Sequence, residues 1–141
     1  IENPRIIDLG AGSGCVGFSI LKHCETASLV SIERSEKAFQ YLKENRQLLG
    51  LEARAELHLQ DVREYVAEEK FDIVIANPPY IAENDSATEL NVKKFEPNEA
   101  LFAGEEGYKD LFDWSQKFVS LLKPEGVMLF EMGYQQGARL K

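Results

Sequence analysis

Cysteine is scarce in this sequence, and the positions of the two cysteines indicate neither a disulfide nor a metal site. Cys15 and Cys24 fall in one predicted helix, too far apart along it to form a bridge. Neither belongs to the paired Cys-x-x-Cys spacing that is typical of zinc sites. We therefore expect both side chains to pack in the interior, and we predict no metal ligands.

Long hydrophobic runs are also missing. No apolar stretch approaches the roughly 20 residues that a membrane-spanning helix needs, and the first residues lack the basic and apolar regions of a signal peptide. The sequence therefore predicts a soluble, cytoplasmic protein with no membrane partner. Its 141 residues, 44% of them hydrophobic, are typical of one globular domain.

Basic residues are outnumbered by acidic ones. The chain has 16 Lys and Arg against 24 Asp and Glu, which gives a formal net charge of −8. Proteins that bind nucleic acid through its phosphates usually cluster Lys and Arg. The charge balance therefore weakens the case for nucleic acid as a partner without removing it.

What the sequence does contain is a regular alternation of short apolar runs and helical patterns. The predicted strands span residues 5–9, 29–33, 54–59, 71–76 and 127–131, and the predicted helices span 15–24, 35–49 and 110–122. A Lys-Pro-Glu-Gly turn is expected directly before the last strand. This alternation predicts an α/β fold with a mostly parallel, doubly wound, Rossmann-like sheet, whose ligands bind at the carboxyl ends of the strands.

Three glycines at alternate positions, Gly10, Gly12 and Gly14, follow the first predicted strand. Such a loop lets a ligand lie against the main chain with no Cβ in the way. Residues 12–17 also read Gly-x-Gly-x-x-Gly, the fingerprint of a dinucleotide site. Asp8 favours a different ligand, because a carboxylate repels a pyrophosphate but attracts the ammonium and sulfonium groups of S-adenosylmethionine (SAM). We therefore predict SAM as the cofactor.

Acidic residues also end the second and third predicted strands. Glu33 is placed to accept hydrogen bonds from both ribose hydroxyls, and Asp61 from the adenine amine. Taken singly, each residue also has an explanation without a ligand. Asp8 could cap a helix, and Glu33 could be a solvated residue at the end of a strand. An acid or glycine loop at three successive strand ends is better explained by one cofactor site.

The fourth predicted strand ends in Asn77, Pro78, Pro79 and Tyr80. These residues suit the methylation of an NH2 group on a flat, conjugated acceptor, whose nitrogen is a poor nucleophile. The side-chain carbonyl of Asn77 and the main-chain carbonyl of Pro78 offer two acceptors for its hydrogens, and the Pro pair restricts the direction of the second one. Tyr80 can lie on the flat face of the acceptor. No general base is needed, so we expect His23 and His58 to be ordinary, partly buried residues.

Together these segments resemble a known family. Asp-Leu-Gly-Ala-Gly-Ser-Gly at 8–14, with Glu33, Asp61 and Asn-Pro-Pro-Tyr, resembles the class I SAM-dependent methyltransferases that modify amino groups. Residues 95–108, which begin Phe-Glu-Pro, resemble the signature of the HemK/PrmC protein-glutamine methyltransferases, which act on peptide release factors. So does Phe-Glu-Met-Gly at 130–133 with Gln135 or Gln136 after it.

The resemblance implies a site and a domain organisation. Residues 1–141 would form the catalytic core, as a fragment without the family's N-terminal helical domain and final strand hairpin. Glu33 stands where the family usually has Asp, and Tyr108 where it usually has Leu. The residues expected at the SAM site are Asp8, Gly10, Ala11, Gly12, Ser13, Gly14, Glu33, Asp61, Val62 and Asn77, and those expected to hold the acceptor are Asn77, Pro78, Pro79 and Tyr80.

Three functions remain open at this point. The first is methyl transfer from SAM to a glutamine amide nitrogen of a release factor, the second is methylation of an adenine or guanine amine in DNA or rRNA, and the third is a catalytically silent fragment that binds SAM or a partner. Residues 81–110 carry eight acidic against three basic residues, a local charge of −5. This rim next to Tyr80 would repel phosphates, so a protein acceptor is favoured.

Overall fold

The computed structural model describes residues 1–77 and 109–131. In chain order its elements are β1 (Arg5–Leu9), α1 (Cys15–His23), β2 (Ser28–Glu33), α2 (Glu36–Leu48), β3 (Ala55–Leu59), β4 (Phe71–Ala76), α5 (Lys109–Val119) and β5 (Leu122–Phe130). The strands form one sheet in the order β3-β2-β1-β4-β5, and every neighbouring pair is parallel. The predicted α/β class with a parallel sheet is confirmed.

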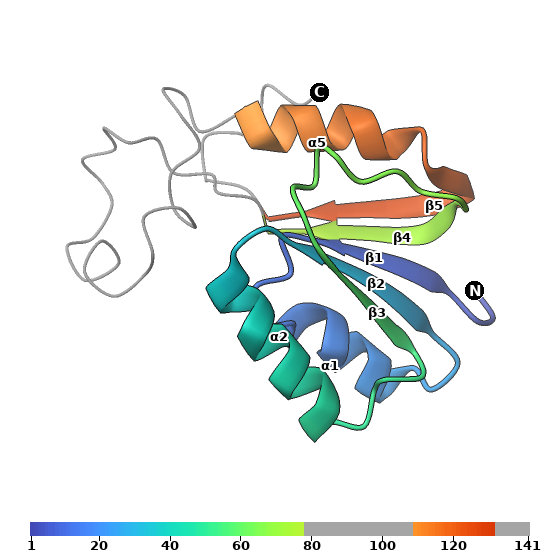
Figure 1. Cartoon of the computed structure of the whole chain (residues 1–141). Helices are drawn as coiled ribbons and strands as arrows, with labels where there is room; N and C mark the ends of the chain where they lie inside the picture. Colours follow the sequence, from blue (N-terminus) through green and yellow to red (C-terminus); the bar gives the residue numbers. More distant parts are fainter. Residues whose placement is uncertain (78–108, 132–141) are drawn as a thin grey trace.

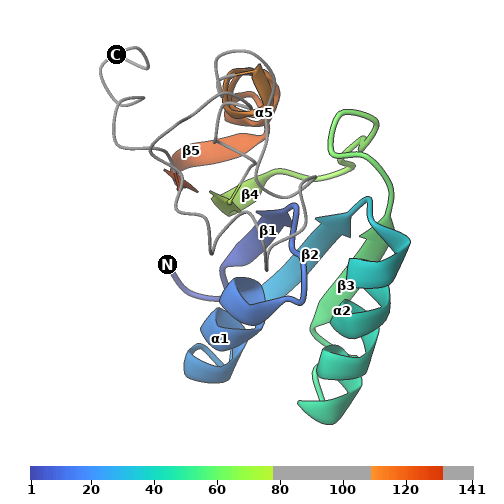
Figure 2. The ribbon, with the colours of Figure 1, turned by 90° about the vertical axis from the view of Figure 1, so that its left-hand side faces the viewer.

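Helices cover both faces of the sheet. α1 and α2 lie on one face and α5 lies on the other (Figure 1). Figure 2 shows the strands in turn, from β5 beneath α5 to β3 beside α2. The chain moves outward from β1 to β3 in one direction and from β4 to β5 in the other, so the strand order reverses between β1 and β4. A doubly wound sheet of this kind opens a crevice at the reversal point.

The core divides between the two faces because successive strand residues point to opposite sides. Ile7 and Leu9 of β1 belong to the cluster that includes Trp114 and Phe118 of α5. Ile6 belongs to the other cluster, with residues of α1 and α2. The central strands are apolar on both faces, as burial between two helical layers requires.

The helices begin as the sequence predicts. α1 starts directly after the glycine loop, with Gly14 at its N-cap and no side-chain cap hydrogen bond. α2 starts after Ser35, whose side chain accepts a hydrogen bond from the Ala38 N–H at 3.4 Å. A hydroxyl that satisfies a free N–H of the first turn is a favourable N-cap.

The last strand differs from the prediction. β5 begins at Leu122, not at residue 127, and the expected Lys-Pro-Glu-Gly turn lies inside it. Pairing shifts register there, because Phe71 pairs with Leu122 but Ile73 pairs with Val127. α5 ends at Val119, three residues earlier than expected. The turn-forming residues therefore make an irregularity within β5, and they do not separate it from α5.

Candidate functional site

Three predicted site residues lie at the carboxyl ends of neighbouring strands. Leu9 of β1 pairs with Ile32 of β2 on one side and with Ala76 of β4 on the other. Gly10, Glu33 and Asn77 each come one residue after these paired positions, so the parallel register brings them to one edge of the sheet. This edge contains the reversal point between β1 and β4, where the fold is expected to bind ligands.

The glycine loop is held in a defined shape. Gly10, Gly12 and Gly14 have φ values of 68°, 57° and 82°, in the left-handed region. The Ala11 N–H donates to the Ile32 carbonyl at 2.9 Å, and the Gly14 N–H donates to the Ala11 carbonyl at 2.8 Å. A Cβ at Gly14 would lie 2.4 Å from the Phe18 ring and 2.6 Å from Leu42. Gly14 therefore needs to be glycine both for its conformation and for its close packing.

Glu33 joins this loop to α2. One carboxylate oxygen accepts from the Gly12 N–H at 2.8 Å and the other from the Ser35 N–H at 2.7 Å, and the residue is buried. Each carboxylate oxygen has a second lone pair, so these bonds leave acceptor capacity for a ligand. The ribose role stays a prediction. Sequence reasoning missed the second role, in which Glu33 holds the glycine loop.

Asp8 is directed toward α1. Its Oδ2 accepts from the Gly17 N–H at 3.2 Å, and the residue is only 5% exposed. The pKa of Asp8 is raised to about 7, mainly by burial, which outweighs the opposing effect of the Gly17 hydrogen bond; the nearby Glu33 carboxylate also contributes to the rise. Desolvation of this kind disfavours the charged form of a carboxyl group. Asp8 thus lies beneath the loop, buried against α1.

Asp61 is bound to an arginine that sequence reasoning did not include. Arg63 donates to it from its main-chain N–H at 2.8 Å, from Nε at 2.9 Å and from Nη2 at 2.7 Å, and Arg34 lies 3.9 Å away. The Arg63 side-chain hydrogen bonds are the main reason that the pKa of Asp61 falls to about 2. The Asp-x-Arg spacing was the available signal. The contact of Asp61 with adenine remains a prediction. In that contact the Asp61 carboxylate would accept from the adenine amine as well as from Arg63.

Val62 contributes to the core through its side chain, which is buried on the α5 face. Its carbonyl accepts a hydrogen bond from Lys117 of α5 at 3.1 Å. Burial is the main cause of the lowered pKa of Lys117. If Val62 contacts a ligand, as predicted, its main chain would have to provide that contact.

Trp114 is a further residue near the site, and the sequence did not indicate its contact with the glycine loop. The helical pattern predicted it on the apolar side of the helix, and it is buried on that side. A Cβ at Gly10 would lie 3.2 Å from the edge of its ring, so the indole packs directly against the glycine loop. Within residues 1–77 and 109–131 its buried Nε1 has no hydrogen-bond partner. The apolar pattern predicts burial but not which loop the ring supports.

The acceptor residues are described only in part. Asn77 follows β4 directly and is exposed. Pro78, Pro79, Tyr80, the acidic segment that follows them and the residues after Glu131 lie outside the described ranges. The described site therefore consists of the glycine loop, the three acidic residues at the strand ends and Asn77.

The sequence matches the family described as methyltransferase small domain over residues 2–101. The chain belongs to this family. The match confirms, at the level of the family, the predictions of a methyltransferase and of SAM as its methyl donor. It also supports the choice of SAM over a dinucleotide for the glycine loop.

Relatives with curated names extend the match over most of the chain. A release factor glutamine methyltransferase from Shewanella oneidensis is 32% identical over 140 residues, which cover 99% of this chain and 49% of the relative. One of the same name from Enterococcus faecalis is 36% identical, covering 96% of this chain and 49% of the relative. The chain thus spans about half the length of these relatives, and the predicted resemblance is confirmed.

A solved structure shows the same fold. A chain from Thermoplasma acidophilum, described as a methyltransferase, superposes with a TM-score of 0.64 at 20% sequence identity. The alignment covers 90% of this chain and 43% of the other. At this identity the likeness establishes the fold, which agrees with the predicted class I methyltransferase architecture.

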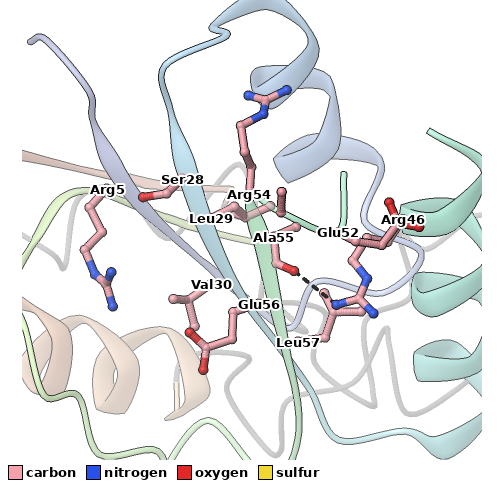
Figure 3. Close-up of a pocket in the computed structure, with 11 residues that line it drawn as sticks. Arg5, Ser28, Leu29, Val30, Arg46, Glu52, Arg54, Ala55, Glu56 and Leu57 are labelled. Atoms are coloured by element: carbon pink, nitrogen blue, oxygen red, sulfur yellow. Dashed lines mark hydrogen bonds between the residues drawn. The ribbon is translucent and has the colours of Figure 1, made fainter. Parts of the chain in front are cut away.

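A separate pocket of about 410 Å³ lies at the opposite ends of the strands in this methyltransferase domain. It is lined mainly from the beginnings of β2 and β3, and Arg46, which also lines it, donates to the Ala55 carbonyl at 3.1 Å (Figure 3). None of the residues predicted for the cofactor site lines this pocket.

Two smaller predictions for the methyltransferase domain were partly wrong. Cys15 is exposed at the start of α1, whereas Cys24 is partly buried. His23 is exposed and bonds to the Ser19 carbonyl, whereas His58 is partly buried beside Glu56. The two residues predicted wrongly, Cys15 and His23, both belong to α1. In so short a helix the sequence pattern does not determine well which residues face the sheet and which face solvent. Among the described residues, no helix is long and apolar enough to cross a membrane.

Proposed function

We propose that the complete protein transfers a methyl group from SAM to the side-chain amide nitrogen of a glutamine in a peptide chain release factor. The observation that carries this proposal is the position of Asn77, one strand away from the glycine loop at the same level of the sheet. The curated relatives named for this reaction support the acceptor. The protein would act in the cytoplasm, where release factors work on the ribosome.

The donor half of the site suits a cationic ligand without phosphate. The buried Glu33 contacts the glycine loop through the Gly12 N–H, whereas the buried Asp8 is bonded to Gly17 of α1, beneath the loop. The Glu33 carboxylate would repel a pyrophosphate, whereas it would attract an ammonium or sulfonium group. SAM would supply an activated methyl group on its sulfonium. Glu33 would hold the ribose, and the loop from Gly10 to Gly14 would lie along the methionine part.

The acceptor half would act by position. The lone pair of the amide nitrogen forms the new N–C bond to the methyl carbon, the S–C bond breaks, and its electron pair stays on sulfur to give S-adenosylhomocysteine. The nitrogen then releases one proton to solvent. We propose that the Asn77 side-chain oxygen and the Pro78 carbonyl accept from the two N–H groups and turn the lone pair toward the methyl group. Tyr80 would cover the flat face of the amide.

The decisive experiment uses the complete protein, because the chain spans about half of its relatives. Labelled SAM is offered with a release factor, with the same factor after its loop glutamine is changed to alanine, and with single-stranded and duplex DNA. We expect label in the first factor alone. Label in DNA would favour the nucleic-acid alternative. Label that enters the alanine variant as fast as the parent factor would contradict glutamine as the acceptor. SAM binding without any methyl transfer would favour the catalytically silent fragment.

A further inference from the structure

We infer that Asn45 of α2 is a positioning residue of the methyl-donor site, which holds the glycine loop in the shape that receives SAM. This inference rests on the proposed function. Asn45 Nδ2 donates a hydrogen bond of 2.9 Å to the main-chain carbonyl of Ser13, 32 residues earlier in the chain. It is a side-chain bond between α2 and Ser13, a residue of the glycine loop.

The bonded carbonyl belongs to a peptide unit that needs an external restraint. The Ser13 carbonyl and the Gly14 N–H are the two ends of one peptide group. Because Gly14 tolerates φ values of either sign, this peptide could rotate without the steric cost that another residue would impose. In the structure it is held at both ends, by Asn45 on the carbonyl and by the Ala11 carbonyl on the N–H at 2.8 Å. Asn45 thus supplies one of the two restraints on its orientation.

The position of α2 makes this restraint specific. Leu42 lies one helical turn before Asn45, on the same side of α2, and its side chain packs closely against Gly14. The Ser35 N–H, at the start of the same helix, donates to Glu33 at 2.7 Å. Glu33 in turn accepts from the Gly12 N–H. α2 is therefore connected to the loop directly through Asn45 and indirectly through Glu33, so it couples the predicted ribose residue to the peptide at Gly14.

Loss of the Asn45 hydrogen bond should affect the binding of SAM more than the binding of the acceptor. Loss of the Asn45 bond would free the peptide before Gly14, and part of the binding energy of SAM would be used to order it again. Asn77 follows β4, on the opposite side of β1 from β2, so it lies away from this bond in the strand order. A defect at Asn45 should therefore raise the dissociation constant of SAM while leaving kcat at saturating SAM nearly unchanged.

The experiment compares four variants of the complete protein. Asn45→Ala removes the donor, Asn45→Asp replaces it with an acceptor of the same shape, and Asn45→Gln keeps an amide donor on a longer side chain. Gln40→Ala is the matched control, because Gln40 is an exposed residue of the same helix that bonds only to Glu44 at 2.8 Å in the described structure. The measurements are the dissociation constant of SAM, kcat at saturating SAM, and the midpoint of thermal unfolding.

We expect Asn45→Ala to weaken SAM binding about tenfold, the effect of one lost hydrogen bond in an ordered site. Asn45→Asp should weaken it more, since its carboxylate would face the Ser13 carbonyl, and Asn45→Gln should recover part of the affinity. Equal SAM affinity in Asn45→Ala and Gln40→Ala would overturn the inference. So would a loss in Asn45→Asp no larger than in Asn45→Ala. Failure of the parent protein to bind SAM would instead contradict the proposed function.

Discussion

At the scale of single residues, the acids of the site have partners inside the protein before any ligand is considered. Glu33 accepts from Gly12 and Ser35, Asp8 from Gly17, and Asp61 from Arg63. Charge-assisted hydrogen bonds of this kind fix both the side chain and the main chain that it contacts. The site is therefore largely preorganised, which lowers the cost of ordering it around a ligand.

Glu33→Ala should weaken SAM binding by about 1 to 3 kcal/mol, because a buried, charge-assisted acceptor is lost together with its hold on Gly12. Isothermal titration of SAM measures the change, and Glu36→Ala on the exposed first turn of α2 is the control. A dissociation constant equal to that of the parent would mean that Glu33 does not contact the ribose.

Asn77→Ala in the complete protein should lower the rate of methyl transfer by roughly two to three orders of magnitude, by analogy with other oriented polar groups that act in a transition state. The loss should appear mainly in kcat, because the proposed contact orients the lone pair during transfer. Steady-state kinetics with a release factor provides the test. A rate within a few-fold of the parent would remove Asn77 from the reaction.

Asp8 should make stability depend on pH. Its pKa rises from 3.8 to about 7 in the folded protein, chiefly through burial. The folded state therefore holds this proton more tightly than the unfolded state, so the contribution is complete below about pH 4 and is lost as the pH rises toward 7. Relative to Asp8→Asn, the parent should lose on the order of 2 kcal/mol of unfolding free energy between pH 5 and pH 8. Parallel pH profiles for the two proteins in urea unfolding would contradict this assignment.

At the scale of elements, local patterns in the sequence predict much of the fold. β1 and β4 have the predicted bounds, and Ser35 caps α2 as expected, because apolar periodicity and capping depend on neighbouring residues. β5 was predicted too short, because Lys-Pro-Glu-Gly has the composition of a turn while pairing of Leu122 with Phe71 extends the strand. The contacts of side chains with main chain in other elements, such as Trp114 with Gly10 and Asn45 with the Ser13 carbonyl, follow only from the folded arrangement.

The loop between β1 and α1 offers a matched pair of substitutions. Gly12 and Gly14 both have left-handed φ values, but a Cβ at Gly12 meets nothing within 4 Å, whereas one at Gly14 would lie 2.4 Å from Phe18. Both alanine variants should lose about 1 to 2 kcal/mol for the backbone conformation. Gly14→Ala should lose a further 1 to 3 kcal/mol or so from overpacking. Denaturant unfolding measures both, and equal stabilities would show that the packing around Gly14 relaxes freely.

At the scale of the whole molecule, the fold separates two tasks around the reversal point of the sheet. The glycine loop, Glu33 and Asn45 lie on the side of β1 that leads to β2 and α2, and Asn77 follows β4 on the other side. The donor would thus be held mainly from the β2 and α2 side, and Asn77, which is predicted to contact both SAM and the acceptor, lies on the β4 side. The formal net charge of the chain is −8, and this negative charge disfavours a polyanionic acceptor such as nucleic acid.

The central claim is that the edge formed by β1, β2 and β4 is a SAM site. Its most direct test is isothermal titration of the complete protein with SAM and, separately, with NAD, together with the Glu33→Ala variant. We expect SAM to bind the parent, to bind the variant more weakly, and to bind the parent far more tightly than NAD does. Tighter binding of NAD than of SAM would contradict the central claim.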